Sequence, residues 1–300
     1  MNIGQQRSRQ ISILCLLSGY SRQAFYQQRR VLERTALQHE LVIQQVLAIR
    51  ERQKNVGARK LYVMLQPFFV EHAIELGRDG LFSLLADNDL LIRKRKRNAP
   101  RTTFSNHWMR KYPDLLSQLV VDTANVLWVS DITYVVIKDG FAYLSLVTDA
   151  YSRKIVGHHL NADLAAEGCV KALKAALKQL PAGCRLIHHS DRGSQYCSTE
   201  YVEQLSKSNI AISMTQNSDP RENAIAERVN GIIKLELLDT KNRTFGEARS
   251  RVSKAVYIYN YERLHSSINM LTPHQAHVLN GPLKRHWKNY YTTKKEVTMT

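Results

Sequence analysis

The first third of the chain places its apolar residues at helical spacing. Residues 9–31 have the pattern of a helix, a glycine-containing turn and a second helix that begins after Ser21, a candidate N-cap. Residues 43–92 contain three further helical patterns, and the turns between them hold Gly57 and Gly77. The pattern therefore predicts a compact all-helical region.

The pattern changes beyond residue 121. Three runs rich in β-branched and aromatic residues follow one another between residues 126 and 160, which predicts an antiparallel meander. Helical patterns then alternate with two short apolar runs, residues 184–189 and 210–215, and a longer helix begins near Asn223. This order predicts a mixed α/β sheet flanked by helices.

Charge distinguishes the two regions. The chain has 43 Lys and Arg against 26 Asp and Glu, so its formal net charge is +17. Residues 1–110 hold 19 basic and 8 acidic side chains, and residues 93–97 are consecutive basic residues. This excess favours a polyanionic partner, because phosphates attract basic surfaces and release counterions when they are neutralised. We therefore interpret the helical region as DNA-binding.

The helix, turn and helix of residues 9–31 indicate which side chains would contact DNA. A helix-turn-helix protein lays its second helix in the major groove. The candidates on that helix and in the basic run are Arg22, Gln23, Gln27, Arg29, Arg93, Arg95 and Arg97. A plain helical hairpin with a solvated basic face would show the same composition, so both interpretations stay open.

Three carboxylates occupy positions that suggest chemistry. Asp131 interrupts an apolar strand, where an unpaired buried charge is costly, and Asp191 stands where the apolar run 184–189 ends. Glu227 shares the polar side of a predicted helix with Lys234, opposite an apolar arc. Carboxylates from separate elements can converge if cations relieve their repulsion, and oxygen ligands suit Mg²⁺. Two such ions would serve an in-line displacement at a phosphate.

Other candidate groups have simpler structural explanations. Asp149 fits a turn in which its side chain bonds to local backbone. The neighbouring pairs His158, His159 and His188, His189 would point to opposite faces of their strands, which makes each pair a poor chelate. The four cysteines have no C-x-x-C spacing and are expected to be buried free thiols.

Four motifs surround and follow the carboxylates. They are WVSDITYV around Asp131, HSDRGSQY around Asp191, ENAIAERVNGIIK around Glu227 and YNYERLHSSINMLTP at residues 259–273. In combination they resemble the IS3 family of bacterial transposases, within the DDE transposases and retroviral-type integrases. The family spaces its second Asp and its Glu by 35 intervening residues and has a basic residue seven positions later, here Lys234.

The resemblance implies a domain order as well as a fold. A helical DNA-binding region at 1–97 and a basic linker at 98–118 would precede a ribonuclease H-like core at 119–280 and a basic tail at 281–300. The expected fold class is therefore α/β, a mixed sheet flanked by helices and preceded by an all-α helix-turn-helix region. No run approaches the roughly 18 apolar residues of a membrane span, so we expect a cytoplasmic protein.

The resemblance also implies an activity. Water would cut one strand at an element end, and the freed 3′ hydroxyl would attack another phosphodiester without a covalent protein intermediate. Asp131, Asp191 and Glu227 would hold Mg²⁺, or Mn²⁺ as a substitute, with two ions per site, and Lys234 would contact terminal DNA. The implied partners are double-stranded DNA with terminal inverted repeats, target DNA, further copies of the chain and a separately encoded helix-turn-helix and zipper protein.

Two other functions are compatible with the same residues. A ribonuclease H-like nuclease would cleave without strand transfer, but it leaves the basic helical region without a role. A non-catalytic DNA-binding protein derived from a transposase would be favoured by the loss of a carboxylate, and all three are present.

We expect residues 1–110 to supply most of the affinity for DNA. Their removal would flatten the slope of log affinity against log salt concentration, because fewer counterions would be released on binding. Salt titrations of the full-length and shortened proteins measure this slope. An unchanged slope would show that the affinity resides elsewhere.

Overall fold

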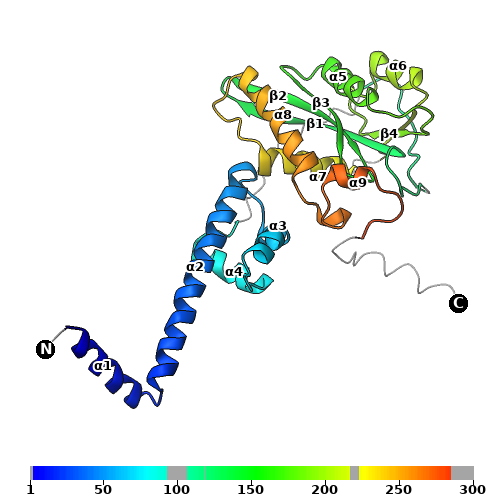
Figure 1. Ribbon diagram of the computed structural model, residues 1–300. Coiled ribbons are helices and arrows are strands. Elements are labelled where there is room, and N and C mark those ends of the chain that lie inside the picture. Colours follow the sequence, from blue (N-terminus) through cyan, green and yellow to red (C-terminus); the bar gives the residue numbers. More distant parts are fainter. Residues whose placement is uncertain (1–2, 93–106, 118, 217–222, 285–300) are drawn as a thin grey trace. The chain divides into compact units, whose positions relative to one another are not determined.

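The computed structural model describes residues 3–92, 107–117, 119–216 and 223–284, which divide into two compact units (Figure 1). No helix in these ranges is long and apolar enough to cross a membrane. The first unit comprises residues 1–51 and 56–93, and the second comprises residues 52–55 and 94–300. Three candidate DNA contacts lie outside the described residues: Arg93, Arg95 and Arg97.

The first unit is all-helical, as the sequence pattern predicts. Its helices are α1 (Ile3–Leu17), α2 (Arg22–Arg52), α3 (Ala58–Glu71) and α4 (Arg78–Asp87). Gly57 and Gly77 stand at the N-caps of α3 and α4, in extended backbone conformations. Helices α2, α3 and α4 share one apolar core, which includes Val46, Leu61, Leu65, Leu81 and Leu85.

Helix α2 is longer than the pattern suggests. The sequence predicts separate helices at 22–31 and 43–54, whereas α2 runs unbroken over 31 residues. No glycine or proline stands between Arg22 and Arg52, so nothing interrupts the helix. Ser21 caps it as expected, since its Oγ accepts a hydrogen bond from the Ala24 N–H at 3.0 Å.

The DNA-contact candidates on α2 are exposed near its start. Arg22, Gln23, Gln27 and Arg29 all lie on the first two to three turns of the helix that follows the α1–α2 turn. Arg29 Nε donates to Glu33 Oε1 at 2.8 Å within the helix, and both side chains are more than half exposed. An exposed pair of this kind is weak and can be exchanged for a phosphate contact.

The second unit is built on a mixed sheet of five strands within the described residues. These are β1 (Leu127–Ile137), β2 (Gly140–Asp149), β3 (Ile155–Asn161), β4 (Ile187–Ser190) and β5 (Ala211–Met214). Their spatial order is β3-β2-β1-β4-β5. The first three pair antiparallel, β4 is parallel to β1, and β5 is parallel to β4. The predicted meander and mixed sheet are confirmed.

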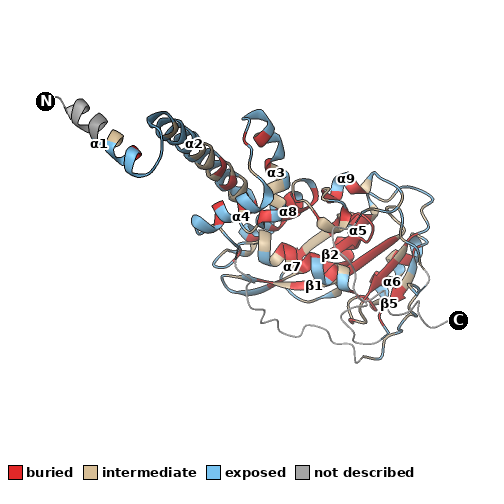
Figure 2. Cartoon of the chain, turned by 90° about the horizontal axis from the view of Figure 1, so that it is seen from below, coloured by how far each residue is buried: buried red, intermediate tan, exposed pale blue. Residues whose placement is uncertain are grey.

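Helices cover both faces of this sheet, because neighbouring strand residues point to opposite sides. Val147 and Val156 pack against α5 (Ala166–Leu177) and α6 (Thr199–Lys207) in one core. Leu146 and Ile155 pack in a second core against α7 (Ala224–Ile232), a π turn η1 (Ile233–Leu237) and α8 (Phe245–Tyr261). A 3-10 turn, η2 (Ser266–Ile268), and α9 (Pro273–His277) follow α8. Figure 2 shows the burial of the sheet, and the arrangement is the expected mixed sheet flanked by helices.

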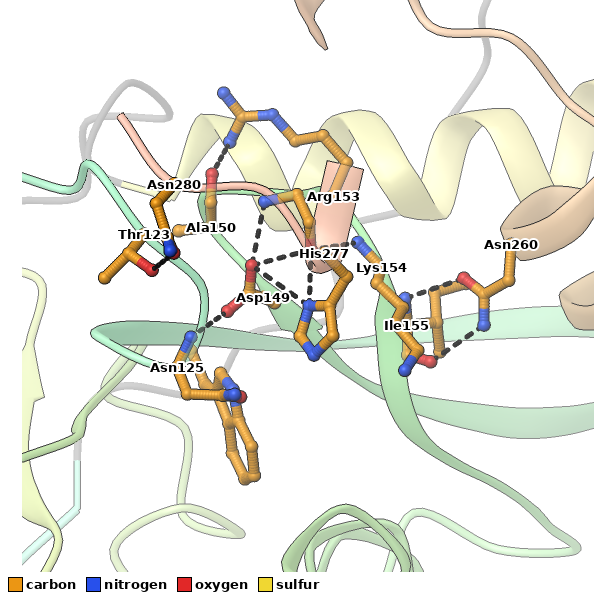
Figure 3. A network of polar contacts seen from close by, with 12 residues as sticks. Thr123, Asn125, Asp149, Ala150, Arg153, Lys154, Ile155, Asn260, His277 and Asn280 are labelled. Carbon is orange, nitrogen blue, oxygen red and sulfur yellow. Dashed lines mark hydrogen bonds and ion pairs between the residues drawn. The ribbon is translucent and has the colours of Figure 1, made fainter. Parts of the chain in front are cut away.

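A buried polar network holds the end of β2 (Figure 3). The Asp149 carboxylate accepts hydrogen bonds from the Asn125 N–H and from the N–H and Oγ of Ser152, all at 2.7–2.8 Å. Burial alone would raise the pKa of Asp149, but contacts with His277, Ser152 and Asn125 outweigh burial and lower the pKa below its usual value. Asp149 is therefore the turn residue that the sequence predicts.

Asn260 of α8 satisfies both backbone groups of Ile155 at the start of β3 (Figure 3). Its Nδ2 donates to the Ile155 carbonyl and its Oδ1 accepts from the Ile155 N–H, each at 2.9 Å. These groups are buried, and the pairing of β2 with β3 is irregular at the neighbouring Val147 and Thr148. A side-chain amide thus satisfies both backbone groups of a residue in the edge strand β3.

We expect Asn260→Ala to lower the free energy of unfolding by about 2–4 kcal/mol, because it leaves two buried backbone groups unsatisfied. Denaturant unfolding measures the loss. Ser253→Ala on the exposed side of the same helix is the matched control and should change stability by less than about 0.5 kcal/mol. Equal losses in the two variants would refute the role of the amide.

Candidate active site

Two of the predicted carboxylates lie on neighbouring parallel strands. Val129 of β1 pairs with His189 of β4. Two residues beyond this pair, each strand reaches an aspartate, Asp131 within β1 and Asp191 directly after β4. Adjacent strands lie about 4.8 Å apart, so the register itself sets the two aspartates side by side.

Glu227, the third carboxylate, lies on α7. This helix forms hydrogen bonds with β1 through one residue before Glu227 and one residue after it. Asn223 at the N-cap of α7 donates from Nδ2 to the Ser130 carbonyl at 3.0 Å. About two turns further along the helix, Asn230 donates from Nδ2 to Asp131 Oδ2 at 2.8 Å. Glu227 is four residues after the first asparagine and three before the second, so all three share one face of the helix. The face that carries Glu227 therefore runs along β1 at Asp131.

The three carboxylates are coupled electrostatically. Burial raises the pKa of Asp131 to about 7, and the negative charge of Asp191 adds to the rise, with a smaller contribution from Glu227. Hydrogen bonds from Asn230 and from the Ile132 N–H act in the opposite direction. Because both other carboxylates act on Asp131, the structure brings the three into one cluster of like charge.

This cluster fits a hard divalent cation with few protein ligands. Across the described ranges, no three or more His, Cys, Asp or Glu side chains converge closely enough to enclose a metal ion by themselves. Mg²⁺ is commonly held by one or two carboxylates and completes its shell with water and substrate phosphate. A cation between Asp131 and Asp191 would relieve the repulsion that raises the pKa of Asp131. The oxygen-only donors suit Mg²⁺ or Mn²⁺ better than zinc.

A tight turn orients Asp191. The Gly193 N–H donates to Asp191 Oδ1 at 3.0 Å, so the carboxylate folds back over the turn. A Cβ at position 193 would lie 3.0 Å from that oxygen and 3.2 Å from Gln195 Oε1. A side chain at position 193 would therefore crowd the Asp191 carboxylate, which closes over this part of the backbone.

The helix that carries Glu227 ends in a wide turn. In η1 the Leu238 N–H donates to the Ile233 carbonyl at 2.9 Å, five residues back. A regular helix leaves Leu235 and Leu238 off the apolar arc; after the π turn Leu238 packs against the second core, whereas Leu235 stays 39% exposed. Single π turns recur at functional sites.

Lys234 lies in this π turn, one turn beyond Asn230. Its Nζ is 3.0 Å from the centroid of the Tyr134 ring on β1. Partial burial lowers the pKa of Lys234 to about 8. The ammonium is therefore held against an aromatic face of β1 and is not free in solvent, unlike an ordinary surface lysine.

Sequence reasoning missed three residues of this site: Asn223, Asn230 and Tyr134. The signal was present, because positions 223, 227, 230 and 234 recur at the spacing of one helical face. Considered alone, that face is polar, and the pattern does not show whether solvent or another element covers it. In the fold it lies along β1, and Asn230 is only 5% exposed.

The histidines and cysteines do not join the site. His188 is buried, its Nε2 lies 2.8 Å from Ser130 Oγ and 2.9 Å from Tyr201 Oη, and burial lowers its pKa to about 3. It is a neutral core residue. His189 instead contacts Ser213, at 2.9 Å from Nδ1 to Oγ. All four cysteines are free thiols, and Cys184 is the partly exposed one.

Asp131→Asn should stabilise the metal-free protein at high pH. Because the raised pKa favours the protonated carboxyl in the folded state, Asp131 loses its stabilising contribution as pH rises from about 4 through about 7. At pH 8 we expect the variant to gain about 1 kcal/mol or more, and thus a few degrees in Tm, with the gap narrowing toward pH 4. Thermal unfolding across pH measures it. A gap independent of pH would contradict the assigned repulsion.

Family models match the second unit of the chain. An integrase core domain model matches residues 122–220, and a second integrase core domain model matches residues 208–273. Asp131 and Asp191 fall within the first match, and Glu227 and Lys234 fall within the second. The two matches together enclose the three carboxylates and Lys234.

Bacterial insertion elements encode relatives that cover most of the chain. A 31 kDa protein of insertion element IS600 from Shigella sonnei is 34% identical over 267 residues, 87% of this chain and 96% of the relative. Transposase InsF of IS3A from Escherichia coli is 31% identical over 240 residues, 77% and 80% of the two chains. Among solved structures, the HTLV-2 integrase catalytic core domain in complex with magnesium covers 52% of this chain and 97% of its own, with 21% identity and a TM-score of 0.42. With this identity and coverage, the chain belongs to the IS3 family of insertion-sequence transposases and contains an integrase core domain.

Proposed function

We propose that the chain cleaves one DNA strand at each end of its element and joins the freed 3′ hydroxyl to target DNA. The observation that carries the proposal is the cluster of Asp131, Asp191 and Glu227, in which each of the other two carboxylates raises the pKa of Asp131. The repulsion between these carboxylates is unfavourable in a protein that binds no cation. Binding of a divalent metal ion for phosphoryl transfer would relieve it.

Each carboxylate has a defined role in the proposed reaction. Asp131, Asp191 and Glu227 would hold two Mg²⁺ ions, or Mn²⁺ in their place. Bound ions of this kind activate the attacking oxygen and stabilise the leaving oxygen of an in-line displacement. Asn230 donates to Oδ2 of Asp131 and the Gly193 N–H donates to Oδ1 of Asp191, so both carboxylates are oriented by hydrogen bonds within the chain.

The chemistry balances without a covalent protein intermediate. In the first step the oxygen of water bonds to phosphorus, and the bond from phosphorus to the 3′ oxygen breaks. In the second step that 3′ oxygen bonds to a phosphorus of the target strand, and one target P–O bond breaks. Both are displacements at phosphorus, so one site serves both.

The proposed DNA contacts come from both units. Lys234 would bind a phosphate of the terminal DNA beside the carboxylates. Arg22, Gln23, Gln27 and Arg29 of α2 would bind duplex DNA within the helical region 1–97. We further propose that the chain works as a homo-oligomer on DNA that carries terminal inverted repeats, and that a separately encoded helix-turn-helix and zipper protein assists it.

The test uses purified full-length protein and a supercoiled plasmid that carries the gene with its native flanking DNA, with Mg²⁺ or Mn²⁺. We expect metal-dependent joining of the two flanking sites, abolished in Glu227→Gln and retained in Glu203→Gln, an exposed α6 residue paired with Lys207. Sequencing of free 3′ ends and joined products gives the readout. Nicking without joining would indicate a nuclease, and intact binding without chemistry would indicate a DNA-binding protein.

A further inference from the structure

A buried ion pair in the C-terminal motif is left unexplained by the proposed chemistry. Arg263 is 3% exposed, and its Nε and Nη2 donate to Glu236 Oε2 at 3.0 and 2.7 Å. Its Nη1 lies 3.0 Å from His265 Nε2, and the His265 ring packs edge-on against Tyr259 at 4.8 Å between centroids. Burying such a pair brings little net stability, so we interpret its role as holding the two side chains in a fixed geometry.

The acidic partner of this pair lies in the π turn. Glu236 is two residues after Lys234, and both are within η1. A π turn is rare and usually limited to a single turn, so it depends on contacts outside the helix. The guanidinium of Arg263 provides such a contact, because its planar donors hold a carboxylate in a defined direction. The pair thus fixes the turn from which Lys234 extends.

A second support lies on the opposite side of Lys234. The ammonium sits over the face of Tyr134, and the Tyr134 ring packs edge-on against Phe141 at 5.4 Å, at an interplanar angle of 90°. The ring is therefore held in place by the β1–β2 hairpin. Lys234 is held at its backbone by the turn and at its ammonium by the strand.

We infer that Arg263, through Glu236, and Tyr134, through its ring, are positioning residues that hold Lys234 for a phosphate of the terminal DNA. The inference rests on the proposed function, because it takes Lys234 as a DNA contact. A free lysine side chain loses much rotamer freedom when it binds. Lys234 has lost part of that freedom before DNA arrives, which favours binding.

A double-mutant cycle separates positioning from simple stability. Affinity is measured at one salt concentration for duplex DNA that carries the element end mapped in the joining assay. We expect Lys234→Met to weaken binding about tenfold, Arg263→Met about 3- to 10-fold, and the double variant no more than Lys234→Met alone. Replacing Arg263 should lower Tm by the same amount in the unaltered protein and in the Lys234→Met variant. Multiplied losses of affinity in the double variant would overturn the inference, since Arg263 would then act independently of Lys234.

Further variants keep the test decisive if Arg263→Met does not fold. Glu236→Gln breaks the same ion pair from its more exposed side and should lower affinity by a similar factor. Tyr134→Phe keeps the aromatic face and should retain affinity, whereas Tyr134→Leu should weaken binding by no more than Lys234→Met does. Lys207→Met removes one exposed positive charge from α6 and should leave affinity unchanged.

Failure of this inference differs from failure of the proposed function. If Lys234→Met binds terminal DNA as well as the unaltered protein, Lys234 is not a DNA contact and the inference is wrong. Transposase chemistry is judged separately, by joining that depends on metal and on Glu227. If the protein joins DNA but the replacements of Arg263 and Lys234 weaken binding independently, only the positioning role is wrong.

Discussion

The parallel pairing of β1 with β4 is the constraint on which the site depends. Side chains alternate along a strand, so a register slip of one residue would send an aspartate to the opposite face of the sheet. With Val129 opposite His189, Asp131 and Asp191 continue the same register. The apolar residues on either side hold this register, because Trp128 and Leu127 are almost fully buried on opposite faces of β1.

The carboxylate cluster destabilises the folded protein, and the apolar packing around the cluster offsets this loss. Burial, together with the like charges of Asp191 and Glu227, raises the pKa of Asp131 to about 7, so the ionised site is unfavourable near neutral pH. Two apolar cores, one on each face of the sheet, offset this cost. Functional sites often retain such unfavourable interactions, because binding of cations and phosphates later relieves them. The two asparagines of α7 limit the movement of the carboxylates meanwhile.

The C-terminal motif acts within the chain in this structure. Asn260 completes the backbone bonding of Ile155, and Arg263 ties Glu236 of the π turn. His265 lies beneath Arg263 and beside Tyr259, in a position that supports the pair. Three residues of one short motif thus join β3, η1 and α8. Asn260 thus fixes α8 to β3, and Arg263 fixes η1, the turn that carries Lys234.

Local periodicity in the sequence determined the element types, the mixed sheet and the all-helical first unit, because helix and strand periods are properties of neighbouring residues. Motif spacing likewise singled out Asp131, Asp191 and Glu227. Only the tertiary structure decided that Asn230 faces Asp131, that Lys234 lies on Tyr134 and that Glu236 pairs with Arg263. These contacts join residues 27 to 100 positions apart, and they depend on which face of α7 lies against β1. A helical pattern marks that face as polar, but it does not say whether water or a strand covers it.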